Sequence, residues 1–225
     1  MKPILFNGEM VRAILDGSKT QTRRVVDSIA GMGRVTEFQA SQTPGYAWTF
    51  RDRRSLWNDL TDSQLLSHCP FGKPGDRLWV REAFRPYPPQ SGNAWEILYA
   101  ADAEVIKYEA PSTYRPMLYN YERWYPSIHM PRWASRITIE VTDVRVQRLQ
   151  DISEEDARSE GLECYFYEEQ WWYYVPEKIE GCVNYLPMFC QVWDSCFPNP
   201  LTPPVGRGWH DNPWVWAISF KRVEV

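Results

Sequence analysis

The segment between residues 17 and 24 brings amine, hydroxyl and guanidinium groups together within eight positions, and it reads Gly-Ser-Lys-Thr-Gln-Thr-Arg-Arg. A threonine hydroxyl is a weak nucleophile until a neighbouring base removes its proton. The amine of Lys19 acts as such a base only where burial or a nearby cation lowers its pKa, and Arg23 and Arg24 can supply that cation. Arg24 can alternatively bind a phosphate or carbonyl oxygen through its planar guanidinium group.

Two short elements are predicted to position this segment. Apolar residues four positions apart predict a helix over residues 9–16, with Asn7 as its N-cap and Gly17 in the left-handed conformation that ends it. The following residues favour a strand over 20–26. Lys19 would then lie at the corner between helix and strand.

Side-chain alternation along that strand gives its residues two different faces. Thr20, Thr22 and Arg24 are expected on one face, because successive side chains of a strand point to opposite sides. These three residues are therefore the ones that the strand would present together.

The remaining elements predict an α+β fold. Strands are expected over residues 77–84, 95–100, 136–146 and 214–220, and helices over 151–162 and 188–196. A one-residue change in the apolar alternation after Thr142 and Asp143 predicts a bulge or bend. The order of elements is typical of a small β-barrel, or a strongly curved sheet, with two helices at its rim.

Long aromatic-rich insertions are expected to decorate this fold. They cover about residues 27–68, with a helix near 56–66, and about residues 85–130 and 163–212. The closing strand alternates Trp214, Trp216, Ile218 and Phe220, which predicts one heavily buried face. We expect residues 1–225 to form a single domain.

Charge is distributed unevenly along the chain. The net charge of the 225 residues is −4, yet residues 1–54 hold nine basic and five acidic side chains, a net +4, whereas residues 151–200 hold two basic and eleven acidic ones, a net −9. The N-terminal quarter can therefore face a phosphate backbone while the acidic segment lies elsewhere. An ordinary solvated surface with local variation in charge is the alternative.

Several classes of protein are excluded by the sequence. No apolar run is long enough to span a membrane, and the first residues do not resemble a signal peptide, so we expect a cytoplasmic protein. The five cysteines are irregularly spaced, which indicates reduced thiols. We expect neither a metal nor another cofactor, because the sequence shows no metal-ligand spacing, phosphate-binding loop, dinucleotide fingerprint or nucleophile elbow.

The segment from Gly17 to Arg24 resembles the G-x-K-T-x-T-x-R signature of the ASCH family, whose fold is a PUA-like barrel. Four further blocks are similar to family elements in the same order: the turn and strand at 74–78, the strand at 137–146, the helix at 152–160 and the closing strand at 214–222. The whole chain is most similar to the larger ASCH proteins of bacteriophages and prophages. Compact members have no counterpart of the three insertions.

This resemblance implies recognition of RNA or of a modified nucleobase in a cleft between barrel and helices. In one compact branch it also implies amidohydrolysis of N4-acetylcytidine, and the positions that match the base, the nucleophile and the proton donor are Lys19, Thr22 and Glu160. Arg24 matches the signature arginine. Each residue also has an ordinary interpretation: Lys19 as a cation at a helix C-terminus, Thr22 as a strand residue and Glu160 as a solvated helix residue.

Aromatic side chains extend the set of candidate ligand-binding residues. Rings that can stack on bases are those of Trp48, Trp57, Trp79, Trp95, Tyr114, Trp124, Trp171 and Trp172. Trp79 alternates within a predicted strand and also suits packing, whereas Trp171 and Trp172 belong to an aromatic run that cannot all point inward. The candidate ligand-binding residues are Thr20, Arg23, Arg24, Trp79, Trp171 and Trp172.

Three functions are consistent with these observations. The first is a protein that binds RNA or a modified nucleobase, the second an amidohydrolase that removes an N4-acyl group from cytidine, and the third a non-enzymatic phage protein that holds a protein partner through its aromatic insertions. Recognition of nucleic acid or nucleobase is the interpretation that we favour.

Overall fold

The structure is a computed structural model that describes residues 1–89, 94–111, 123–162, 165–167, 170–172, 185–197 and 204–223, with only the backbone for 165–167 and 170–172. Within these residues the chain is an α+β protein, built mostly from strands with four α-helices. It divides into two compact units: unit 1 comprises Met1–Gly17, Asp76–Glu140 and Lys221–Val225, and unit 2 comprises Ser18–Gly75 and Val141–Phe220. The single domain and the barrel expected from the sequence stay predictions.

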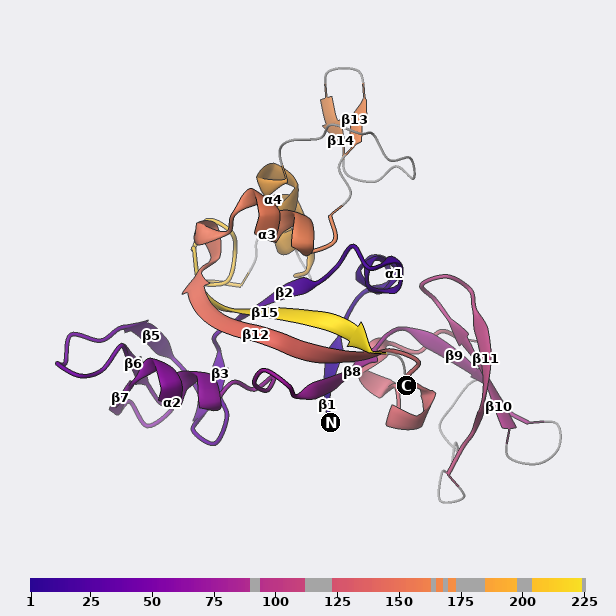
Figure 1. Cartoon of the computed structure of the whole chain (residues 1–225), viewed down its shortest axis with the longest axis horizontal. Helices are drawn as coiled ribbons and strands as arrows, with labels where there is room; N and C mark the ends of the chain where they lie inside the picture. Colours follow the sequence, from indigo (N-terminus) through magenta and orange to yellow (C-terminus); the bar gives the residue numbers. More distant parts are fainter. Residues whose placement is uncertain are drawn as a thin grey trace. The chain divides into compact units, whose positions relative to one another are not determined.

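Unit 1 combines a small mixed sheet with an antiparallel three-stranded sheet (Figure 1). Its elements are β1 (Lys2–Leu5), α1 (Gly8–Asp16), β8 (Arg77–Arg81), β9 (Phe84–Tyr87), β10 (Ala94–Tyr99), β11 (Val105–Glu109), the 3-10 helices η1 (Ser127–His129) and η2 (Arg132–Ala134), and the first residues of β12 (Thr138–Arg148). β8 pairs in parallel with β1 and antiparallel with the start of β12, and the second sheet has the order β11-β10-β9.

Aromatic side chains fill the core of unit 1. Trp79, Phe84, Trp95 and Tyr99 are buried in one cluster of β8, β9 and β10. The Tyr99 hydroxyl donates a hydrogen bond of 2.7 Å to the backbone oxygen of Ala134, which satisfies its polar end inside the core. The insertion at 85–130 therefore contributes aromatic residues to the core, among them Trp95 and Tyr99.

Unit 2 carries the remaining elements. They are β2 (Gln21–Val25), β3 (Ser28–Ile29), β4 (Gly33–Arg34), β5 (Glu37–Ala40), β6 (Trp48–Arg51), β7 (Trp57–Leu60), α2 (Asp62–Ser67), the end of β12, the 3-10 helix η3 (Leu149–Asp151), α3 (Glu154–Ser159), β13 (Tyr165–Tyr167), β14 (Gln170–Trp172), α4 (Leu186–Ser195) and most of β15 (Trp214–Val223). β15 pairs antiparallel with β2, and β5, β6 and β7 form a sheet in that order.

The local signals for the short helices are confirmed. The Asn7 side chain accepts a hydrogen bond of 2.8 Å from the backbone N–H of Met10, and Gly17 adopts a φ of 85° directly after α1. In β12 the neighbouring residues Thr142 and Asp143 are both exposed, which is the predicted change of phase within one continuous strand. None of the helices among the described residues is long and apolar enough to cross a membrane.

The expected helix near residues 56–66 is wrong in its first half. Residues Trp57–Leu60 form β7 and pair with β6, and a helix begins only after Thr61. The Thr61 hydroxyl and the Gln64 side chain make reciprocal hydrogen bonds to each other's backbone N–H groups, a capping box that fixes the start of α2 there. The apolar residues between positions 56 and 66 are therefore divided between the strand β7 and the helix α2.

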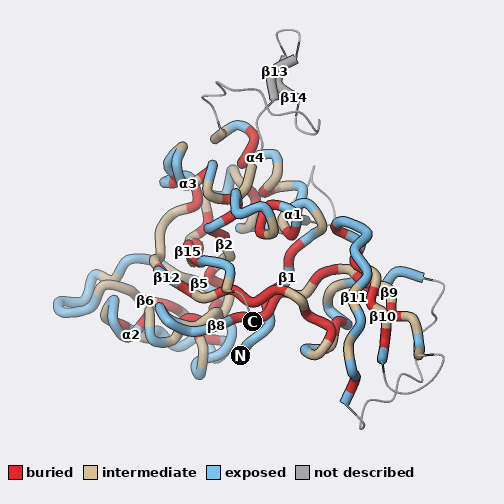
Figure 2. The backbone as a smooth tube through the Cα atoms, turned by 45° about the vertical axis from the view of Figure 1, so that its right-hand side comes forward, coloured by how far each residue is buried: buried red, intermediate tan, exposed pale blue. Residues whose placement is uncertain are grey.

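The closing strand is buried on both faces, whereas one buried face was expected (Figure 2). Trp216 and Ile218 are buried as predicted, but Val215 and Ala217 on the opposite face are also fully buried. Val215 packs in the second core cluster with Phe189 and Trp193 of α4. A helix that arrives from a distant part of the chain covers this second face, so alternation along the strand alone could not reveal it.

Candidate functional site

Backbone hydrogen bonds tie the residues around Lys19 to the end of α3 in unit 2. Lys19 and Glu160 form an isolated antiparallel β-bridge. The backbone N–H of Thr20 donates to the oxygen of Ser159 at 2.8 Å, and the N–H of Phe220 donates to the oxygen of Thr20, also at 2.8 Å. The residues before β2 are thus held between β15 and the C-terminal end of α3.

A buried carboxylate at this point accepts hydrogen bonds from two cations. Lys19 Nζ donates to Glu160 Oε2 at 2.7 Å and to the Glu160 backbone oxygen at 2.7 Å, while Arg23 donates to Glu160 Oε1 at 3.0 Å. The side chains of Lys19 and Arg23 are 0% exposed, and that of Glu160 is 6% exposed. Burial lowers the pKa of Lys19, and the charge of Glu160 opposes that shift.

A second carboxylate, that of Asp156, lies one helical turn before Glu160 and joins the same set of ion pairs. This carboxylate accepts hydrogen bonds from Arg23 at 2.8 Å, from Arg145 at 2.6 Å and from Gln21 at 3.1 Å. Burial alone would raise the pKa of Asp156, but the hydrogen bonds from Arg145 and Gln21 and the charge of Arg23 together lower it. We call Lys19, Arg23, Asp156 and Glu160 the buried ion-pair network.

Local sequence explains why α3 presents both carboxylates to β2. The Ser153 hydroxyl caps α3 by accepting a hydrogen bond of 3.1 Å from the N–H of Asp156, and Gly161, with a φ of 79°, allows the chain to turn directly after Glu160. Residues four positions apart share a helix face. Asp156 and Glu160 therefore point in the same direction.

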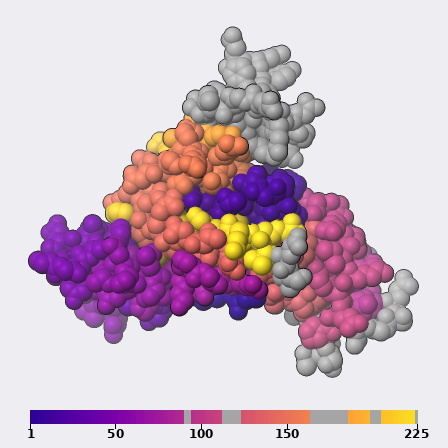
Figure 3. Space-filling model, viewed as in Figure 1, coloured from indigo at the N-terminus to yellow at the C-terminus, as the bar shows by residue number. Residues whose placement is uncertain are grey.

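Helix α4 packs beside α3 and covers part of the network. Atoms of α3 and α4, in salmon and orange, form one continuous surface in Figure 3. The Arg23 guanidinium lies 5.7 Å from the centre of the Phe189 ring of α4. The fully buried cation is thus in contact with an aromatic ring as well as with two carboxylates.

Of the predicted catalytic residues, the structure brings Lys19 and Glu160 together but does not join Thr22 to them. Thr22 is buried in β2 opposite Ile218 of β15. Within the described part of the chain its hydroxyl makes no hydrogen bond to Lys19 or Glu160. Thr22 alternates along β2 with Gln21 and Arg23, whose side chains bind Asp156.

The predicted shared face of Thr20, Thr22 and Arg24 is not formed by one strand. β2 begins at Gln21, so Thr20 lies outside it and is exposed, while Thr22 is buried and Arg24 is half-buried opposite Trp216. Burial lowers the pKa of Arg24, with Glu160 opposing the shift. The charge of Arg24 in turn contributes to the lowered pKa of Lys19, which is the effect expected of a neighbouring cation.

The predicted ligand-binding tryptophans are placed differently from one another. Trp79 is 6% exposed in the core of unit 1, with the Arg81 guanidinium 4.6 Å from its ring centre. Trp171 and Trp172 belong to β14, and their side chains lie outside the described residues. The hypothesis of a protein-binding aromatic surface there stays a prediction.

Sequence reasoning missed Gln21, Asp156 and Arg145 as members of the site. The four-residue spacing from Asp156 to Glu160 on a predicted helix was a signal that could have identified the second carboxylate. No local signal identifies Arg145, which lies on β12. Among the residues whose side chains are described, no group of three or more His, Cys, Asp or Glu side chains could hold a metal ion.

Comparison of this chain with models of protein families, with curated protein sequences and with solved structures finds no match.

Breaking the buried Lys19–Glu160 pair should be strongly destabilising. Lys19→Met leaves the Glu160 carboxylate buried with one cation fewer, and the expected loss in the free energy of unfolding is about 3–5 kcal/mol. Adding Glu160→Gln to Lys19→Met should recover part of that loss. The matched control is Arg51→Met, which breaks the exposed Arg51–Glu37 pair and should cost less than about 1 kcal/mol. Urea denaturation measures all four proteins, and equal losses for Lys19→Met and Arg51→Met would contradict a stabilising role.

Asp156 should make the stability of the chain sensitive to acid. Because its pKa is lowered in the folded state, the unfolded chain binds the proton first, so its stabilising contribution is present above the usual value of 3.8 and is lost as the pH falls below it. Asp156→Asn should flatten the dependence of unfolding free energy on pH below about 4, whereas exposed Asp143→Asn should keep the wild-type slope. Denaturation series at several pH values test this, and a steep acid dependence in Asp156→Asn would refute it.

Proposed function

We propose that this chain is an ASCH-type protein with a PUA-like barrel, similar to the larger phage and prophage members, and that it recognises RNA or a modified nucleobase. The observation that carries the proposal is the contact between Lys19 and Glu160, which are 141 positions apart in sequence and 2.7 Å apart in space. These are two of the positions that the resemblance assigns to the site. A motif match that arose by chance would have no reason to bring its distant positions into contact.

The chemistry of the network supports recognition of a nucleobase edge. A cytosine presents an amino donor next to ring and carbonyl acceptors, and it is complemented by a carboxylate that lies beside cationic donors. Glu160 is such a carboxylate, because Lys19 and Arg23 each donate to one of its oxygens. A base that reaches this point would exchange hydrogen bonds with groups that are already held in position.

A half-buried aromatic cluster in the same unit supports binding of single-stranded nucleic acid. Phe38 and Trp48 are stacked with ring centres 5.2 Å apart, and Trp48 meets the edge of Trp214 at 4.9 Å. The Arg148 guanidinium lies 4.4 Å from the centre of the Trp214 ring. Aromatic and arginine side chains in such an arrangement are typical platforms for stacked bases.

Titration of the intact chain with a 12-nucleotide single-stranded RNA, followed by tryptophan fluorescence, tests recognition. We expect binding at 50 mM salt that weakens as salt increases, because phosphate contacts release counterions. Trp48→Leu should weaken binding by about 1–3 kcal/mol. Trp57→Leu, which removes a 51% exposed ring from the neighbouring strand, is the control and should bind like the wild type. Absence of binding to RNA, cytidine and N4-acetylcytidine at 50 mM salt would refute the proposal.

Amidohydrolysis of an N4-acylated cytidine is a second candidate function, favoured by the burial of Lys19 and its lowered pKa. In this reaction the Thr22 hydroxyl attacks the acyl carbon while its proton passes to the Lys19 amine. The bond from carbon to N4 breaks as Glu160 gives a proton to the departing amine, and water then releases the acid from Thr22. The reaction requires the Thr22 hydroxyl to come within hydrogen-bond reach of Lys19, a contact that the described hydrogen bonds do not include.

Conversion of N4-acetylcytidine to cytidine, measured by absorbance, separates the two candidates. If the chain is a hydrolase, Thr22→Val should lower the rate by at least about 100-fold, because valine keeps the shape of threonine without its hydroxyl. Thr138→Val, at another buried threonine, controls for loss of a buried hydroxyl and should keep the wild-type rate. A wild-type protein without deacetylase activity, or a fully active Thr22→Val variant, would exclude this function and leave recognition standing.

A further inference from the structure

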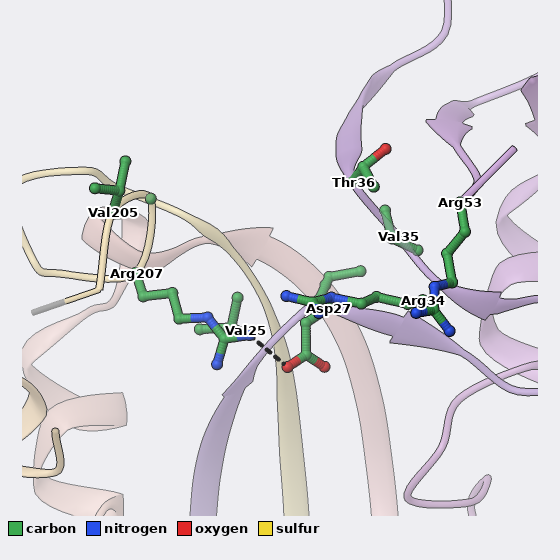
Figure 4. A pocket seen from close by; sticks show the side chains of 10 residues that line it. Val25, Asp27, Arg34, Val35, Thr36, Arg53, Val205 and Arg207 are labelled. Carbon is green, nitrogen blue, oxygen red and sulfur yellow. Dashed lines mark hydrogen bonds and ion pairs between the residues drawn. The ribbon is translucent and has the colours of Figure 1, made fainter. Parts of the chain in front are cut away.

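A cavity of about 460 Å³ lies in unit 2, and none of its lining residues belongs to the buried ion-pair network. Its charged lining residues are Asp27 after β2, Arg34 in β4, Arg53 after β6 and Arg207 in the loop that precedes β15. Figure 4 shows Arg207 reaching Asp27 from one side, while Arg34 and Arg53 lie on the other. Three guanidinium groups thus line a space that contains one carboxylate.

The positive charge of this cavity is not neutralised by the described residues around it. Arg207 donates to Asp27 at 3.0 Å, which leaves two guanidinium groups in excess. Among the described side chains, none forms an ion pair with Arg34 or Arg53. The neighbouring arginines behave differently: Arg51 pairs with Glu37 at 2.8 Å and Arg54 with Asp52 at 3.2 Å.

The backbone positions of these groups are set by hydrogen bonds within the unit. The buried Trp193 of α4 donates from its indole nitrogen to the backbone oxygen of Arg207 at 2.8 Å. The N–H of Val35, next to Arg34, donates to the backbone oxygen of Asp27 at 3.0 Å. These hydrogen bonds hold the backbone at Arg207, Asp27 and Val35 in place, which lowers the entropic cost of binding a ligand there.

The cavity also adjoins the aromatic cluster of Phe38, Trp48 and Trp214. The N–H of Val26, which lines the cavity, donates to the backbone oxygen of Trp214 at 2.9 Å. An anion in the cavity would consequently lie close to rings that can stack on a base. Guanidinium groups bind phosphate oxygens through paired hydrogen bonds and remain charged at any physiological pH.

We propose that this cavity binds one phosphate group of a single-stranded nucleic acid. Arg34 and Arg53 donate hydrogen bonds to the phosphate oxygens, while Arg207 stays paired with Asp27. The inference rests on the proposed nucleic-acid recognition and assigns it a phosphate subsite formed by the insertions at 27–68 and 163–212. It also explains what the basic N-terminal quarter contributes, because several of its other arginines are engaged with carboxylates.

The salt dependence of RNA binding by the intact chain tests this subsite. Loss of one phosphate contact in Arg34→Gln/Arg53→Gln should reduce the slope of log affinity against log salt by about 0.7–1. Both side chains are exposed, so the double variant should fold normally. Arg54→Gln, adjacent in sequence but paired with Asp52, is the control and should keep the wild-type slope. Pyrophosphate should compete with RNA for the wild type but not for the double variant.

A gain of affinity provides an independent readout that a damaged fold cannot produce. Asp27→Asn removes the carboxylate and frees Arg207, so we expect tighter RNA binding and a steeper salt dependence than in the wild type. RNA binding by the wild type with an unchanged slope in the double variant would overturn the subsite and leave the proposed function intact. A wild type that binds no RNA at 50 mM salt would also overturn the subsite, and the proposed function would fail with it only if cytidine and N4-acetylcytidine did not bind either.

Discussion

The buried ion-pair network is the interaction on which unit 2 depends. Transfer of a charge from water into a protein interior costs several kcal/mol unless an opposite charge receives it at hydrogen-bond distance. Lys19 and Arg23 are both fully buried, and each meets a carboxylate of α3 at 3.0 Å or less. The pairing therefore constrains the position of α3 relative to β2 much more closely than apolar contacts would, because apolar packing is not directional.

Arginine serves two distinct purposes in the same unit. Arg23 is enclosed by Asp156, Glu160 and the Phe189 ring, so its charge is compensated internally and contributes to the fold. Arg34 and Arg53 face solvent in the cavity and are free of such compensation among the described residues. The difference is one of environment. A buried guanidinium is costly unless carboxylates or other acceptors pair with it in the folded protein, whereas water solvates an exposed one and leaves it able to bind a ligand.

Unit 1 contains a second arginine whose charge is compensated by carboxylates and that lies against an aromatic ring. Arg136 donates to Glu82 at 2.9 Å and to Asp102 at 2.8 Å, and its guanidinium lies 4.0 Å from the centre of the Tyr99 ring. Burial raises the pKa of Glu82, although the hydrogen bond from Arg136 opposes the shift. A chain with many buried polar side chains thus relies on arginine to satisfy its carboxylates.

The sequence by itself determined the short helices and the strands beside them, because caps, glycine stops and alternation act over a few residues: Asn7 and Gly17 bound α1 as expected, and Ser153 begins α3. The resemblance to the ASCH family placed Lys19, Thr22 and Glu160 in one expected site, and the structure joins Lys19 to Glu160 but not Thr22 to either. The sequence misjudged residues 56–60, where pairing with β6 prevailed over helical spacing. Only the tertiary structure decided which charges are neutralised and which remain available. Arg207 and Asp27, 180 positions apart, meet in one cavity because distance in space, and not spacing along the chain, governs electrostatic contact.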